Sequence, residues 1–149
     1  MQNLVFMAAR SIASEGKLYF GTGEGKLGMI DLRDIVDCAE RTVVSDEYEN
    51  QIFLLSGPES ISFQDISDRL TQIFARSIQY AAVPPETMEQ SIRAMGMGDW
   101  YAQVIRDLCK AYRENWGDIL TDSVPHITGH PARSFDVFAR EIFAPESKL

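Results

Sequence analysis

The sequence predicts an α/β domain with a small mixed sheet and about five helices. Apolar residues at helical spacing alternate along the chain with short β-prone runs. No repeat, low-complexity tract or linker-like segment interrupts this order. A chain of 149 residues is long enough for one hydrophobic core, since folding at this size buries roughly 68–70% of the unfolded surface. We therefore expect residues 1–149 to form a single domain.

Residues 1–44 predict two helices that flank a pair of strands. Residues 3–14 have helical spacing, and the runs "KLYF" and "LGMI" are β-prone strands expected to be joined by a tight turn. A second helix begins after Asp31, which is well placed to cap it. The residues expected on one apolar face of this helix are Ile35, Cys38, Ala39 and Val43.

The middle of the chain predicts two further strands around a helix. Residues 52–55 form a compact apolar run that Gly57 and Pro58 stop, which is typical of a strand buried on both faces. Ser62 can cap the next helix, with Asp65 at its third position. The run "IQYAAV" then predicts another strand.

Three helices are expected in the remainder of the chain. Two prolines, Pro84 and Pro85, open the first of them. A longer helix is predicted over residues 99–116, where Gly117 stops it, and a last helix follows residue 133. The residues expected to face inward from the first and last of these helices are Met88, Ile92, Met95, Phe135, Phe138, Ala139 and Ile142.

Composition excludes several kinds of partner. The net charge is −8 and the isoelectric point is near 4.7, without a stripe of Lys and Arg, so we expect no nucleic-acid partner. The sequence shows neither an apolar run long enough to span a membrane nor a secretory signal, so we expect no membrane partner and a cytoplasmic protein. Cys38 and Cys109 lie on apolar helix faces and are expected to be buried, reduced thiols.

The glycine-rich stretch "GTGEGKLG" contains the spelling G-x-G-x-x-G at residues 23–28. A dinucleotide site requires a helix directly after such glycines, whereas here "MID" predicts a strand. Phe20 and Leu27 exclude a phosphate-binding P-loop, because they stand where its first glycine and its Ser or Thr would be. We therefore expect turn glycines and no bound cofactor.

Other candidate chemistry has plainer explanations. His126 and His130 have a spacing that suits metal ligands on a helix, but Gly129 and the neighbouring prolines argue against a helix there. Asp31, Asp34 and Asp37 lie in the first turns of a predicted helix, where carboxylates stabilise the helix dipole. The sequence predicts no metal site and no catalytic residue.

Several segments together resemble one known family. These are "GKLGMIDLRDIVDCAERTVV", "FLLSGPESISFQDISDRL", "IQYAAVPPETMEQSIRAMGMGDWYAQ" and "ITGHPARSFDVFARE". In this order they resemble the C-terminal half of an NmrA-like, quinone-oxidoreductase-type atypical short-chain dehydrogenase, a Rossmann-type NAD(P)-binding protein. The family's N-terminal, nucleotide-binding half has no counterpart here, and no Tyr-x-x-x-Lys pair is present.

The resemblance implies a substrate-side half without its cofactor side. We expect a non-catalytic binding or regulatory protein with an apolar small-molecule pocket and self-association. The alternative is a component or fragment of an NAD(P)H-dependent oxidoreductase that is active only with a nucleotide-binding partner. A third hypothesis, a stable relic without a ligand, stays open.

Two further expectations concern binding. Strands that would pair with the absent half present unpaired backbone and an apolar flank, so we expect a homo-oligomer, most simply a two-fold dimer. In the resembled family the region around "AMGMGDWY" helps to shape the substrate pocket. The candidate ligand-binding residues are therefore Met88, Met95, Met97, Trp100 and Tyr101, with packing in a core or interface as the alternative.

Overall fold

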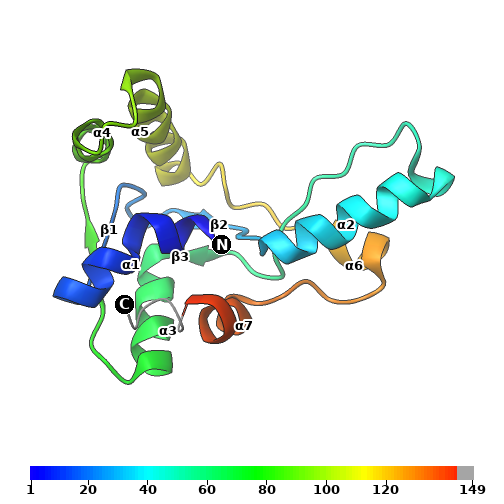
Figure 1. Ribbon diagram of the computed structural model, residues 1–149, viewed down its shortest axis with the longest axis horizontal. Coiled ribbons are helices and arrows are strands. Elements are labelled where there is room, and N and C mark those ends of the chain that lie inside the picture. The colour runs from blue at the N-terminus through cyan, green and yellow to red at the C-terminus, as the bar shows by residue number, and fades with distance from the viewer. Residues whose placement is uncertain (144–149) are drawn as a thin grey trace.

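The computed structural model describes residues 1–143. Its body holds α1 (Asn3–Glu15), α3 (Phe63–Phe74) and α7 (Phe135–Phe138), which surround two short β ladders. From this body a pair of helices rises at one end and a long arm projects at the other (Figure 1). The predicted single domain extends to residue 149, and residues 144–149 lie outside the described residues; the domain assignment stays a prediction.

The strands pair across long sequence distances. β1 (Lys17–Phe20) runs parallel to β4 (Gln79–Ala82), and β2 (Lys26–Leu27) runs antiparallel to β3 (Ile61–Ser62). The mixed α/β class is therefore confirmed. The predicted pairing of β1 with β2 across a tight turn was wrong, because each of these strands pairs with a strand from the middle of the chain.

Local capping fixes where two helices begin. The Asp31 side chain accepts a hydrogen bond from the backbone N–H of Arg33 at the start of α2 (Leu32–Val44). Ser62 and Asp65 cap each other's backbone N–H groups at the start of α3. Both predicted starts are confirmed, since a cap depends only on residues within one turn.

The rising helix pair consists of α4 (Pro85–Ala94) and α5 (Asp99–Arg113), which lie side by side in Figure 1. Met88 and Ile92 of α4 are buried against α5. Met95 was predicted to face inward, but it is 65% exposed, because α4 ends at Ala94 and Met95 lies in the turn that leaves it.

The projecting arm consists of α2 and the chain that returns beside it, through a 3₁₀ turn at Asp46–Tyr48 (Figure 1). A short helix that the sequence did not predict, α6 (Ser123–Thr128), packs on α2. The predicted apolar face of α2 was largely wrong. Cys38 is buried as expected, but the other buried residue is Asp34, and Ile35, Ala39 and Val43 are not buried.

Residues 52–55 were predicted to form a strand buried on both faces, and this was wrong. They have no strand partner in the described part of the chain, and Ile52 is fully exposed. Phe53 and Leu55 alone turn inward, toward Val124 and Ile127 of α6. The side chains of this run are apolar on both faces, but the described residues pack against only one of these faces.

The hydrophobic core is divided among three clusters. The largest lies between α1, α3 and the C-terminal π-helical turn Ala139–Phe143, the second between α4 and α5, and the third between α2 and α6. Cys38 and Cys109 are buried free thiols, as predicted. None of the helices in residues 1–143 is long and apolar enough to cross a membrane; a cytoplasmic location stays a prediction.

Candidate functional site

An apolar cavity of about 330 Å³ lies where the body meets the α4–α5 pair. It is lined by residues of α1, the end of β1, the chain that follows β2, the start of α3 and the inner face of α5. These residues are Met1, Asn3, Leu4, Met7, Phe20, Leu27, Gly28, Met29, Ile30, Phe63, Ile105, Leu108, Cys109, Tyr112 and Gly117. Such a volume matches the lower end of the range for small-molecule sites in proteins.

The cavity lies at the carboxyl end of β1, where open parallel α/β sheets bind their ligands. Phe20, the last residue of β1, stacks on Phe63 with ring centroids 4.2 Å apart and planes within 8°. Both rings line the cavity and form an aromatic part of its wall. Cys109 contributes a thiol from α5; its burial raises the pKa, so this group stays neutral near pH 7.

Glycines allow the end of α5 to approach the chain between β1 and β2. A Cβ atom on Gly25 would lie 1.8 Å from the carbonyl oxygen of Tyr112, and one on Gly28 would lie 2.0 Å from that of Ile119. Arg113 completes the contact, since its Nε donates to the Gly21 oxygen at 2.6 Å. Two of the three G-x-G-x-x-G glycines, Gly25 and Gly28, therefore serve close backbone packing, and this packing leaves no room for a phosphate against them.

A network of polar contacts fixes the α1 side of the cavity. Gln2 stands beside the lining residue Asn3, and its side chain donates to Asp31 Oδ1 at 2.8 Å while accepting from the backbone of Leu32. Arg33 pairs with the same carboxylate at 2.8 Å and with Glu141 at 2.6 Å. The start of α1 is thereby tied to the start of α2 and to the C-terminal turn.

Comparisons with known proteins give this geometry a context. No family model matches the chain. The NAD(P)H azoreductase of Xenophilus azovorans is 34% identical over 140 residues, which are 94% of this chain and 49% of that protein. The oxidoreductase YesF of Bacillus subtilis is 30% identical over 140 residues, which are 93% of this chain and 49% of that protein.

The fold gives the same result. The NADPH-dependent quinone oxidoreductase QOR2 of Escherichia coli superposes with a TM-score of 0.84 at 17% identity, over 95% of this chain and 51% of that one. The chain shares the fold of half of that enzyme. The predicted resemblance to Rossmann-type oxidoreductases is thus confirmed at the level of the fold. The chain spans about half the length of the relatives it matches.

These relatives correct the predicted function. A non-catalytic binding or regulatory role was the first expectation, and it was wrong: the relatives that cover nearly the whole chain are named azoreductase and oxidoreductase. They support an oxidoreductase function and therefore favour the alternative, a component of an NAD(P)H-dependent enzyme. The absence of a nucleotide fingerprint in this chain does not exclude the activity, because the chain spans only about half the length of these relatives.

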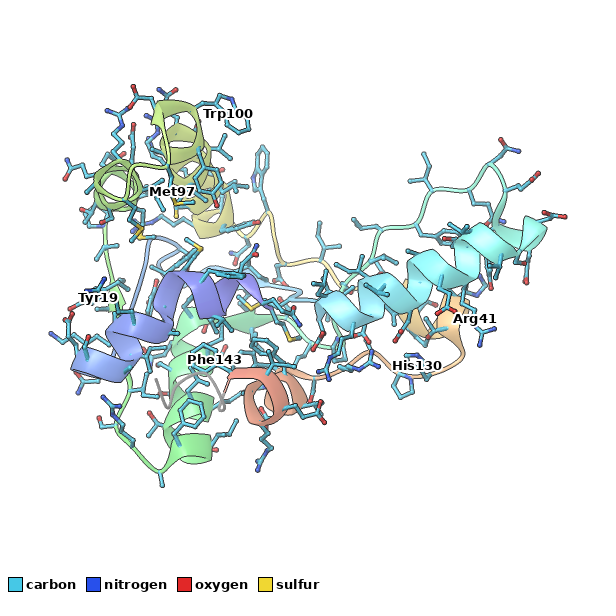
Figure 2. All side chains as sticks on the ribbon, viewed as in Figure 1. Tyr19, Arg41, Met97, Trp100, His130 and Phe143 are labelled. Carbon is cyan, nitrogen blue, oxygen red and sulfur yellow. The ribbon has the colours of Figure 1, made fainter. Side chains whose placement is uncertain are left out.

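The five candidate ligand residues lie elsewhere than the cavity. Met88 is buried between α4 and α5, and Tyr101 packs partly against it. Figure 2 shows Met97 and Trp100 near the turn between these helices, where they are 51% and 76% exposed, and Met95 is exposed beside them. None of these five described residues lines the cavity. Ligand contact at this turn stays a prediction.

Sequence reasoning missed the cavity as a site, although part of the signal was present. The predicted buried face of the 99–116 helix included Ile105, Leu108, Cys109 and Tyr112, all of which line the cavity. The other walls come mainly from α1, β1, residues 27–30 and α3, which are distant from this helix in the sequence.

The charged residues of α2 form a separate cluster. Arg133 pairs with the fully buried Asp34 and with Asp37 at 2.8 Å, and His130 lies 3.5 Å from Asp37. His126 belongs to α6, whereas His130 follows its end at Gly129. Within residues 1–143 no three His, Cys, Asp or Glu side chains come together as metal ligands would.

Proposed function

We propose that this chain is the substrate-binding part of an NAD(P)H-dependent oxidoreductase of the NmrA-like, quinone-oxidoreductase type. It corresponds to the C-terminal half of such an enzyme and is active only together with a nucleotide-binding part. The observation that carries this proposal is the apolar cavity of about 330 Å³ in a fold shared with half of an NADPH-dependent quinone oxidoreductase.

The cavity suits a flat, apolar electron acceptor. The stacked rings of Phe20 and Phe63 offer a face against which an aromatic ring can pack. Met7 and Met29 are flexible thioethers that adapt to irregular apolar shapes. The names of the relatives support this class of acceptor, since one is an azoreductase and another a quinone oxidoreductase. We therefore propose a quinone or an azo compound as the acceptor.

The nucleotide must be held by another part of the enzyme. The described residues that spell the dinucleotide pattern do not fit a pyrophosphate, because Gly25 and Gly28 are packed against the carbonyls of Tyr112 and Ile119. When bound, NAD(P)H would supply the two electrons as a hydride. The role of this chain is to hold the acceptor in an apolar cavity.

A chimera tests the proposal. The part of the Xenophilus azovorans azoreductase that this chain matches is replaced by this chain, and NADPH oxidation is measured with a quinone as acceptor. We expect the chimera to turn over and the free chain to be inactive. In the chimera, Leu108→Trp should raise the KM for the quinone, because Leu108 lines the cavity and is partly exposed, without changing the KM for NADPH.

The control is Gln103→Trp, an exposed position on α5 that does not line the cavity. A chimera that folds and binds NADPH but reduces neither quinone nor azo acceptor would refute the proposed substrate role. Turnover of NADPH by the free chain would refute the need for a nucleotide-binding part.

A further inference from the structure

The stretch of backbone over residues 52–56 is left without partners in the fold. None of its N–H groups donates a hydrogen bond to another group of the described residues. Its one satisfied backbone group is the carbonyl of Leu54, which accepts from Thr121 Oγ1 at 2.7 Å. Figure 1 shows this stretch as a drawn-out trace at the arm, beside α2. Backbone groups left unpaired in this way form a ready template for pairing with another strand.

The side chains of this stretch alternate as they do in a strand with one covered face. Ile52 is 100% exposed and Leu54 is 57% exposed, whereas Phe53 and Leu55 pack toward α6. No charged residue occurs from Asn50 to Pro58. Proteins usually protect an exposed strand edge with charged side chains or proline, and residues 51–57 carry neither.

We propose that residues 51–55 are the dimer interface of this protein, where they pair antiparallel with the same residues of a second copy. The proposal concerns the free chain, and the nucleotide-binding part of the proposed enzyme is the competing occupant of this edge. A second copy offers a strand of equal length, with the same uncharged sequence and the same exposed apolar face. A two-fold contact of this kind closes on itself, so it ends at two chains.

The register follows from the contact with Thr121. In a strand, the N–H and C=O of one residue point to the same edge, and those of the next residue point to the other. The Leu54 carbonyl faces Thr121, so the backbone groups of Phe53 and Leu55 face the opposite edge. With a two-fold axis at Phe53, the Phe53 residues of the two copies form a hydrogen-bonded pair. Leu55 of one copy then lies opposite Gln51 of the other.

The same register satisfies the side chains. Ile52 of one copy lies opposite Leu54 of the other, which covers the two most exposed apolar residues of the segment with each other. Glu49, the nearest carboxylate, lies outside the paired residues, so the pairing sets no like charges across the ladder. The net charge of −8 for each chain therefore does not concentrate at the contact.

Sedimentation equilibrium of the full chain at micromolar concentration tests the proposal. We expect twice the chain mass of 16.8 kDa for the unmodified protein and the single-chain mass for the double variant Ile52→Lys, Leu54→Lys. Both positions are exposed, so the change leaves the core of each chain intact. Val43→Lys is the matched control, since Val43 is 84% exposed but lies on α2, and it should remain dimeric.

Hydrogen exchange gives a second readout. The amides of Phe53 and Leu55 should exchange more slowly in the unmodified protein than in the double variant, because the dimer engages them. A single-chain mass for the unmodified protein would overturn the proposal, as would a double variant that stays dimeric. If the amides of Phe53 and Leu55 exchange slowly only in the azoreductase chimera, this edge pairs with the nucleotide-binding part. Pairing with a second copy is then refuted.

Discussion

Replacing Asp31 with Asn is expected to weaken the α1–α2 junction in a way that depends on pH. The Asp31 carboxylate is fully buried and accepts hydrogen bonds from the side chain and backbone of Arg33 and from Gln2, at 2.8 to 3.1 Å. Burial alone would raise its pKa, but these donors outweigh burial and lower the pKa from 3.8 to about 2. The charged form therefore stabilises the fold.

The magnitude follows from the lowered pKa. Each pKa unit corresponds to about 1.4 kcal/mol. The ionised carboxylate therefore stabilises the folded state by about 2 kcal/mol at pH 7. Because the pKa is lower in the folded than in the unfolded chain, this stabilisation is complete well above pH 4 and is lost as the pH falls toward 2. By the same relation, about half of it remains at pH 3.

Urea unfolding followed by circular dichroism at pH 7 and pH 3 measures the effect. Asp31→Asn should lower the free energy of unfolding by about 2 kcal/mol at pH 7 and by about half as much at pH 3. The control is Glu24→Gln, which changes an exposed carboxylate between β1 and β2 and should have no comparable effect. An equal loss for Asp31→Asn at both pH values would refute the reasoning, since it would assign the loss to shape and not to charge.

Other consequences of the structure can be checked in the same way. The Cβ of Gly25→Ala would lie 1.8 Å from the Tyr112 oxygen, so this change should cost more than about 3 kcal/mol. A Cβ atom on Gly96 would meet nothing within 4 Å, and this residue has a φ of +74°. Its left-handed backbone should cost only about 1–2 kcal/mol, and similar losses for the two variants in urea unfolding would contradict this order. Burial raises the pKa of both Cys38 and Cys109, so iodoacetamide at pH 7 should label them only after unfolding. Mass spectrometry that finds either one labelled in the native protein would contradict their burial.

The sequence predicted best what is decided within one helical turn. The starts of α2 and α3 were predicted from Asp31 and from Ser62 with Asp65, and the structure has the corresponding hydrogen bonds. The covered face of α2 could not be predicted in the same way. Asp34 is buried there because Arg133, 99 residues away, pairs with it, and no periodicity within α2 reports that partner.

The site depended even more on distant contacts. The strand predicted directly after the glycines of residues 23–28 was wrong, because residues 28–31 form no strand in the structure. A turn does lie at these glycines, with the Gly25 N–H donating to the Thr22 oxygen, but the predicted pairing of the two flanking strands was wrong. Gly25 and Gly28 instead allow close contact with the carbonyl oxygens of Tyr112 and Ile119, which are distant from them in the sequence. Pairing between strands so far apart in the sequence is set by tertiary packing, which the local pattern of one segment does not contain.

The cavity and the unpaired edge lie on different parts of the chain, so their roles can be separated. None of the described residues 51–57 lines the cavity, and none of the cavity residues belongs to the proposed ladder. Binding of an apolar acceptor to the free chain should therefore be the same for the dimer and for the variant with Lys at positions 52 and 54.

Activity in a mixture with a separate nucleotide-binding part can behave otherwise, because that part would compete with a second copy if it used the same edge. Under that condition the activity per chain falls as the concentration of this chain rises. The Ile52→Lys, Leu54→Lys variant would prevent this fall in activity, because it does not dimerise. It would also weaken the contact with the nucleotide-binding part, so its maximum rate would be lower. A fall in activity that disappears in the double variant without loss of the maximum rate would show that the nucleotide-binding part docks elsewhere.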